Sequence, residues 1–198
     1  MSMAYLALRD KRLEGGVPAR LGLHIVNTDG SHSLSSAFRS IRAASSASRG
    51  INTMFILCHG YAGSSAVRQQ SGDFGGMGLE LGREGVFHRN VSMWEDIKGS
   101  VSNIVVYSCG AADTQDGAQG TTADGQYLMG ALAIHTNATV YAADRIQWYS
   151  TYNNLKNGRY DFGAWEGTLY CFLPDGTPAL PISRPPVELS DVFFGRAP

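Results

Sequence analysis

The chain has 198 residues, of which 43% are hydrophobic, so it is long and apolar enough for one folded domain with a buried core. Its formal net charge of -1 gives no general attraction to nucleic acid or to an anionic membrane, and we expect neither as a partner. No stretch of about 18 apolar residues predicts a membrane span, and the N-terminus, interrupted by Arg9, lacks the apolar core of a secretory signal. These features predict a cytoplasmic protein, or one exported without a cleavable signal peptide.

The cysteine content excludes two further classes of protein. Cys58, Cys109 and Cys171 are too few and too irregularly spaced for a disulfide framework. The chain has no CxxC or CxxH cluster and its histidines are scattered, so we expect no structural zinc site. Nothing in the sequence calls for a cofactor.

The first half of the chain alternates apolar runs with a helical pattern, as expected for a parallel sheet with helices on its faces. Residues 21–26 predict a first strand. Residues 33–48 predict a helix, because apolar side chains recur three or four positions apart on one face. Residues 53–58 (TMFILC) are continuously apolar, which predicts a strand buried on both faces, and this strand stops at His59-Gly60.

The second half continues this order. Residues 103–107 (NIVVY) predict a second buried strand, which stops at Ser108-Cys109-Gly110. The other segments predict, in chain order, a hairpin over 78–81 and 85–88, a short helix over 93–98, a mobile loop over 111–125, a helix over 126–135, a third buried strand over 139–143 and a last strand or hairpin at 169–173.

Together these elements predict a single α/β domain over residues 1–198, a three-layer α/β/α sandwich with a mostly parallel sheet. Its core is expected over about 21–173, followed by a Pro-rich tail over 174–198. Three of the predicted strands are followed by polar residues, namely His59, Cys109 and Asp144. Ligands of open α/β sheets bind outside the carboxyl ends of the strands, so these side chains define a candidate site.

A histidine and a cysteine at one sheet edge suit nucleophilic catalysis. A thiol attacks a carbonyl only as the thiolate, and its ordinary pKa of about 8.5 leaves little of that form at neutral pH. A neighbouring imidazole takes the thiol proton and later protonates the leaving group. His59 and Cys109 are therefore the predicted catalytic pair, with the backbone N–H groups of Gly60 and Cys109 as donors to the oxyanion. Cys58, which precedes His59, and Cys171 are interpreted as core residues.

These residues resemble the caspase-like cysteine peptidases, which include caspases, metacaspases, gingipains and CHAT domains. The resemblance lies in Phe55-Ile56-Leu57-Cys58-His59-Gly60 and Val105-Val106-Tyr107-Ser108-Cys109-Gly110, and it extends over about 21–149. In caspases the His lies about 50 residues before the Cys, as His59 does before Cys109. The Gly-Leu-Glu-Leu segment around Leu79, with Trp94 further on, is similar to CHAT-type members.

The chain departs from two subfamilies. Tyr107-Ser108-Cys109-Gly110-Ala111 replaces the caspase pentapeptide Gln-Ala-Cys-x-Gly, and Tyr107 stands where metacaspases place an Asp. The resemblance implies an endopeptidase acting on a protein or peptide substrate through a thioester acyl-enzyme. It also implies that Asp144, with Trp148 and Tyr149, lines the pocket for the residue before the cut, although Asp144 is equally suited to a solvated turn. Asp73, Glu80 and Glu84 are interpreted as solvated charges.

Two other functions remain open from the sequence. His59-Gly60-Tyr61-Ala62-Gly63-Ser64 resembles the oxyanion loop of α/β-hydrolases, which would make the protein an esterase with a Cys nucleophile. Such an enzyme needs a His after its nucleophile, and His135 is the one that follows Cys109. The other alternative is a caspase-like module without catalytic activity that binds partners.

Overall fold

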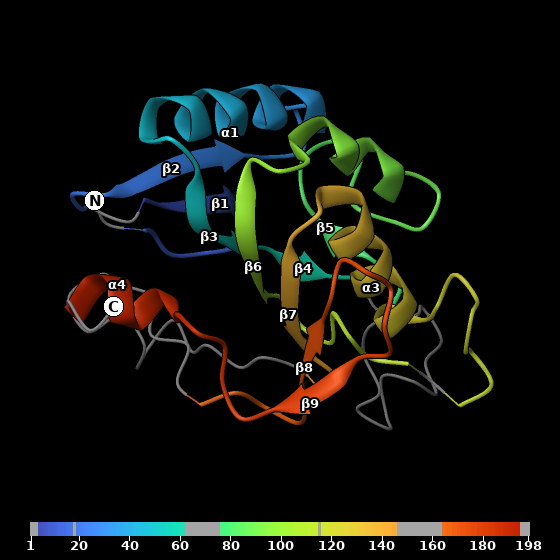
Figure 1. The fold of residues 1–198 in the computed structure, drawn as a ribbon. Coiled ribbons are helices and arrows are strands. Elements are labelled where there is room, and N and C mark those ends of the chain that lie inside the picture. The colour runs from blue at the N-terminus through green and yellow to red at the C-terminus, as the bar shows by residue number, and fades with distance from the viewer. Residues whose placement is uncertain (1–3, 18, 62–75, 115, 146–163, 195–198) are drawn as a thin grey trace.

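The computed structural model describes residues 4–17, 19–61, 76–114, 116–145 and 164–194 (Figure 1). Its centre is a seven-stranded sheet in the order β2-β1-β3-β6-β7-β8-β9. The strands are β1 (Tyr5–Asp10), β2 (Leu23–Thr28), β3 (Ile51–Leu57), β6 (Val101–Tyr107), β7 (Thr139–Ala143), β8 (Leu169–Phe172) and β9 (Leu180–Ile182). The first five in the sheet are parallel, whereas β8 and β9 are antiparallel. The prediction of a mostly parallel α/β sheet is confirmed.

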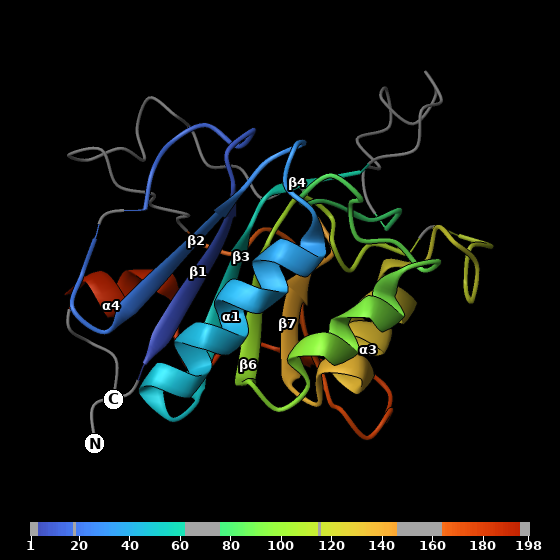
Figure 2. The same ribbon diagram turned by 90° about the horizontal axis from the view of Figure 1, so that it is seen from above.

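Helices cover the two faces of the sheet unequally. Helix α1 (Leu34–Ser48), the 3-10 helix η1 (Val91–Ile97) and helix α3 (Gly125–Thr136) lie on one face, with η1 between the other two (Figure 2). The opposite face is covered by the short helix α4 (Leu189–Phe194) and by irregular segments. Among the described residues, no helix combines the length and apolar character needed to cross a bilayer.

The two long helices begin at residues that cap their first backbone N–H groups. Ser33 accepts from the N–H of Ser36 at 3.2 Å, and Asp124 accepts from the N–H of Tyr127 at 3.0 Å. Each helix ends at a residue in the left-handed conformation, which lets the chain turn away. Local sequence therefore determines both ends of the predicted helices over 33–48 and 126–135.

Side-chain alternation along the central strands separates two buried clusters, one on each face of the sheet. In β3, Met54 and Ile56 join the cluster under α1, η1 and α3, whereas Phe55 and Leu57 join the cluster under α4. The continuously apolar sequence of β3 is thus explained by burial on both faces, as predicted.

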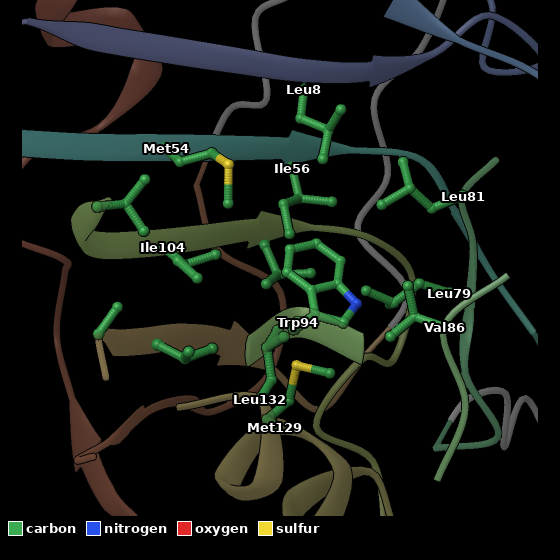
Figure 3. Close-up of a cluster of buried hydrophobic side chains, with 14 of the residues drawn as sticks. Leu8, Met54, Ile56, Leu79, Leu81, Val86, Trp94, Ile104, Met129 and Leu132 are labelled. Atoms are coloured by element: carbon green, nitrogen blue, oxygen red, sulfur yellow. The ribbon is translucent and has the colours of Figure 1, made fainter. Parts of the chain in front are cut away.

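Trp94 of η1 is the largest fully buried side chain of the molecule's described part. It lies among Ile56 of β3, Leu79 and Val86 of the segment after it, and Leu132 of α3 (Figure 3). Its indole N–H has no hydrogen-bond partner in the structure as described. Trp94 therefore holds these elements together by packing alone.

The structure differs from the sequence prediction at both ends of the domain. The first strand is β1, and the strand predicted over 21–26 is the second one, β2, which begins at Leu23 (Leu23–Thr28). The predicted tail is also part of the fold in its described residues 174–194, because these form β9 and α4 and because Val187 and Leu189 are buried. The core therefore extends well beyond 21–173 in both directions.

We expect Trp94→Ala to lower the free energy of unfolding by about 4 kcal/mol, because it leaves a large cavity between the helices and the sheet. Trp94→Phe should cost less than about 2 kcal/mol, because it keeps most of the packing and removes only an unpaired donor. Urea denaturation measures both. Leu21→Ala, at a fully exposed side chain, is the control and should change the unfolding free energy by less than about 0.5 kcal/mol.

Candidate active site

Pairing of β3 with β6 brings the two predicted catalytic residues to one edge of the sheet. Leu57 and Tyr107 are register partners at the carboxyl ends of these strands, and both point into the same buried cluster. Beyond them the N–H of Cys58 still donates to the Tyr107 carbonyl at 3.4 Å. His59 and Cys109 follow Leu57 and Tyr107 by two residues each, so they lie at equivalent positions beyond the ends of the neighbouring strands β3 and β6. His59 is exposed and Cys109 is partly exposed.

Gly60 is packed directly against the backbone of Cys109. A Cβ atom at Gly60 would collide with the Cys109 carbonyl oxygen, and it would lie 3.1 Å from the carbonyl carbon and 3.2 Å from Ser108 Oγ. The backbone of Gly60 has an ordinary φ, so the glycine is required by space and not by conformation. This contact ties the His-Gly turn to the Cys-Gly turn.

The Gly60 N–H is oriented by a small antiparallel ladder. Strand β4 (His59–Gly60) pairs with β5 (Leu79–Glu80), and the N–H of Tyr61 donates to the Gly78 carbonyl at 2.8 Å. Because backbone N–H groups alternate in direction along such a strand, the Gly60 N–H points away from β5. It is therefore turned away from the ladder and suits the predicted role of oxyanion donor.

The turn after Cys109 is held by backbone hydrogen bonds on two sides. Gly110 has a φ of 55°, and its N–H donates to the Arg145 carbonyl at 2.8 Å, next to the end of β7. The Gly110 carbonyl accepts from the N–H of Gly76, also at 2.8 Å. Cys109 is thus placed on a fixed turn between β3 and β7.

A charged network that the sequence did not predict lies beside His59. Glu80 is the cross-strand partner of His59, and its carboxylate accepts from Arg12 Nη1 at 3.0 Å. Arg12 in turn makes a two-point contact with Asp10 at the end of β1, with Nε–Oδ1 and Nη2–Oδ2 distances of 2.8 Å and 2.7 Å. The same Asp10 accepts from the Gly82 N–H at 2.9 Å. This network joins β1 to the β4–β5 hairpin.

The charge of Asp10 is stabilised despite its complete burial. Burial alone would raise the pKa of its carboxyl group, but hydrogen bonds from Arg12 and from the Gly82 N–H outweigh this effect and hold the pKa below its ordinary value. Asp10 was missed because residues 5–10 were not recognised as a strand, although Tyr5-Leu6-Ala7-Leu8 is an apolar run before polar residues, like 53–58.

The interpretation of Glu80 and Glu84 as solvated charges is wrong. Glu80 is paired with Arg12, as described above. Glu84 accepts from the N–H of Leu34 at 2.9 Å, which caps the start of α1 and contributes to lowering the pKa of its carboxyl group against the effect of burial. Asp73 lies outside the described residues.

The three thiols differ in their surroundings. Cys58 is fully buried, as predicted, and burial raises the pKa of its thiol far above the ordinary value. Cys171, predicted as core, is half-buried beside Tyr141, and burial raises its thiol pKa as well. Both effects make these two thiols poor nucleophiles at neutral pH.

The predicted substrate pocket is only partly within the described residues. Asp144 follows β7 and is half-buried, and its Oδ1 accepts from the Thr168 N–H at 2.9 Å. One of its oxygens is therefore engaged in holding the turn before β8. Trp148 and Tyr149 lie outside the described residues, so their place in the pocket stays a prediction.

The segment predicted as a mobile loop is hydrogen-bonded in its described part. Asp124 accepts from the Thr114 hydroxyl at 2.6 Å and from the Gly120 N–H at 2.7 Å, in addition to capping α3. The Asp113 carbonyl accepts from the Gly125 N–H at 2.7 Å. One carboxylate thus organises most of the chain between Cys109 and α3.

Comparison of the chain with protein families, with characterised proteins and with solved structures finds no match.

We expect Gly60→Ala to lower the free energy of unfolding by about 1–3 kcal/mol, because the added methyl group displaces the Cys109 carbonyl. It should also change the alkylation rate of Cys109, since the turn that holds this thiol must shift. Urea denaturation and mass spectrometry of the alkylated thiol measure the two effects. Gly16→Ala is the matched control, because a Cβ there meets nothing within 4 Å. Equal behaviour of the two variants would contradict the contact.

We expect Asp10→Asn to destabilise the protein by about 3 kcal/mol at pH 7, because a neutral amide replaces the buried carboxylate that accepts from Arg12 and from the Gly82 N–H. The folded-state pKa of Asp10 is lowered, so its contribution is complete above the unfolded value of about 3.9 and is lost as the pH falls through the folded value. The difference between wild type and variant in urea denaturation should therefore shrink below about pH 4. Asp96→Asn, at an exposed carboxylate, should show no such pattern.

Proposed function

We propose that this protein is a cysteine endopeptidase in which Cys109 is the nucleophile and His59 the general acid and base. The observation that supports this most strongly is the close packing of Gly60 on the Cys109 backbone at the carboxyl ends of β3 and β6. Packing alone does not call for a histidine and a cysteine at this place. The resemblance to caspase-like peptidases, drawn from the same two turns, points to the same chemistry.

In the proposed reaction, the imidazole of His59 takes the thiol proton, and Cys109 Sγ attacks the carbonyl carbon of the scissile peptide bond. The oxyanion is stabilised by N–H groups of Gly60 and Cys109. The bond to the leaving nitrogen breaks as His59 returns the proton to it, which releases an amine and leaves a thioester on Cys109. Water, deprotonated by His59, then attacks the thioester carbonyl carbon. The C–S bond breaks, the carboxylic acid product leaves, and His59 returns the proton to Cys109 Sγ.

Specificity for the residue before the cut is proposed to involve Asp144, with Trp148 and Tyr149. The carboxylate of Asp144 has one oxygen bonded to the Thr168 N–H, and this fixes its orientation at the end of β7. An acidic group at this position would favour Arg or Lys in the substrate, since unlike charges attract strongly in a partly buried site.

The esterase alternative is disfavoured by the position of His135. This residue is in the last turn of α3, where its Nδ1 lies 2.9 Å from a Glu95 carboxylate oxygen. The Gly99 N–H donates to the Thr136 carbonyl, so the end of α3 lies beside the start of β6. Cys109 follows the other end of this seven-residue strand, about 20 Å away. His135 is therefore too distant to act on Cys109.

The catalytic proposal predicts that Cys109→Ala and His59→Ala each abolish peptide hydrolysis while leaving the fold intact, because one removes the nucleophile and the other its proton carrier. Turnover of a randomised, internally quenched peptide library measures activity, and circular dichroism checks the fold. Full activity in Cys109→Ala would end the proposal.

Thiol labelling separates a catalytic site from a binding module without activity. At about pH 6 an ordinary thiol is almost fully protonated, so only an activated cysteine reacts quickly with iodoacetamide. We expect Cys109 to react far faster than Cys58 and Cys171, and His59→Ala to slow the labelling of Cys109 strongly. Equal labelling of Cys109 and Cys171 in the native protein would favour the non-catalytic module.

A further inference from the structure

A cavity of about 330 Å³ lies beside the candidate dyad, outside the residues that the proposed reaction uses. Its walls come from three parts of the chain: the residue after Gly60, the segment over 77–89 that contains β5, and the loop before α3. The lining residues are Tyr61, Met77, Phe87, His88, Arg89 and Thr122. Two of them adjoin the site directly, since Tyr61 follows Gly60 and Met77 follows the Gly76 whose N–H bonds to the Gly110 carbonyl.

The position of the Phe87 ring, which forms part of the cavity wall, is fixed by two glycines of the backbone. The ring of Phe87 lies in a slot between Gly78 and Gly85, where an added Cβ would approach ring carbons to 2.6 Å in each case. Both glycines have a positive φ, which other residues rarely adopt. The two glycines therefore hold the Phe87 ring between them at one side of the cavity.

That seated ring is half-buried and stacks on Tyr61, with ring centroids 5.0 Å apart and an angle of 28° between the planes. The guanidinium carbon of Arg89 lies 4.2 Å from the Phe87 ring centroid, in the geometry of a cation–π contact. With the thioether of Met77, these groups make a surface suited to a large flat or aliphatic side chain.

Among the described lining residues, Arg89 is the one whose side chain is charged at neutral pH. The ring of His88 stacks on Tyr127, and its Nε2–H donates to the Asp124 carbonyl at 3.2 Å. Burial is the main cause that lowers the pKa of His88 below its ordinary value, so this imidazole is neutral at pH 7. The described walls of the cavity are thus mostly apolar, and Arg89 places a positive charge at the exposed rim.

The position of the cavity relative to His59 indicates which part of a substrate faces it. Side chains two residues apart along an extended chain point to the same side, so Tyr61 lies on the side of β4 to which His59 points. The imidazole that protonates the leaving amine must lie where the departing chain lies. A cavity next to His59 therefore faces the residue that follows the cut.

We propose that the cavity of Tyr61, Met77 and Phe87 binds the side chain of the substrate residue immediately after the scissile bond, and that it selects an aromatic or large aliphatic residue there. This inference rests on the proposed cysteine endopeptidase activity. It adds a second determinant of specificity on the leaving-group side, separate from Asp144. Arg89 disfavours Lys and Arg at the same substrate position, because like charges repel at the rim.

Internally quenched peptides that differ only in the residue after the cut test this assignment. For the wild type, kcat/KM should be at least about tenfold higher with Phe than with Gly at that position. Phe87→Ala should abolish this preference, Phe87→Leu should keep part of it, and Arg89→Gln should raise relative turnover of peptides with Lys there. Leu180→Ala, which removes an exposed apolar side chain on edge strand β9, is the matched control and should retain the wild-type profile.

Iodoacetamide labelling of Cys109 distinguishes failure of the pocket from failure of the enzyme. The reagent is too small to need the cavity, so Phe87→Ala and Phe87→Leu should label at the wild-type rate if the dyad is intact. Unchanged discrimination between Phe and Gly in both Phe87 variants, or a wild-type preference for Gly, would overturn the pocket assignment alone. Unselective labelling of the wild-type thiols, together with no peptide cleavage, would overturn the endopeptidase and the pocket with it.

Discussion

The candidate site depends on the parallel pairing of β3 with β6. Their register places Leu57 opposite Tyr107, and the hydrogen bond from the Cys58 N–H to the Tyr107 carbonyl extends the pairing to the last residue before each turn. A shift by one residue would exchange the two faces of the sheet and move His59 relative to Cys109. Burial of both faces of these strands makes such a shift costly, so the hydrophobic core fixes the position of the proposed catalytic pair.

Polar contacts connect the paired strands β4 and β5, which include His59, to the rest of the molecule. Asp10 and Arg12 connect the end of β1 to Glu80 and Gly82, and Glu84 caps the start of α1. The charged groups in these contacts are buried or partly exposed. Removal of one partner from such a pair therefore costs more folding free energy than removal of one partner from a surface ion pair. Phe87 follows Val86, which pairs with Leu79 of β5, so the segment that pairs with His59 leads directly to the proposed specificity surface.

Much of the fold was predictable because its signals are local. The apolar runs of β3, β6 and β7 and the helical patterns of α1 and α3 lie in consecutive residues, and the structure confirms these elements. The placement of His59 and Cys109 at one edge of the sheet was predictable for the same reason, because each follows a buried strand. Contacts between distant segments were not predictable: Glu80 reaches Arg12 across 68 positions, and Asp10 reaches Gly82 across 72.

The C-terminal residues cover the face of the sheet that carries Phe55 and Tyr107. The N–H of Leu189 donates to the buried Tyr107 hydroxyl at 3.2 Å, and Trp165 stacks on the same tyrosine ring with centroids 4.9 Å apart. Val187 and Leu189 fill the cluster that also contains Phe55. A shortened chain that stopped near residue 173 would expose these aromatic rings to water on the strands that lead to His59 and Cys109. Any fragment chosen for expression or for fusion to another protein should therefore include α4.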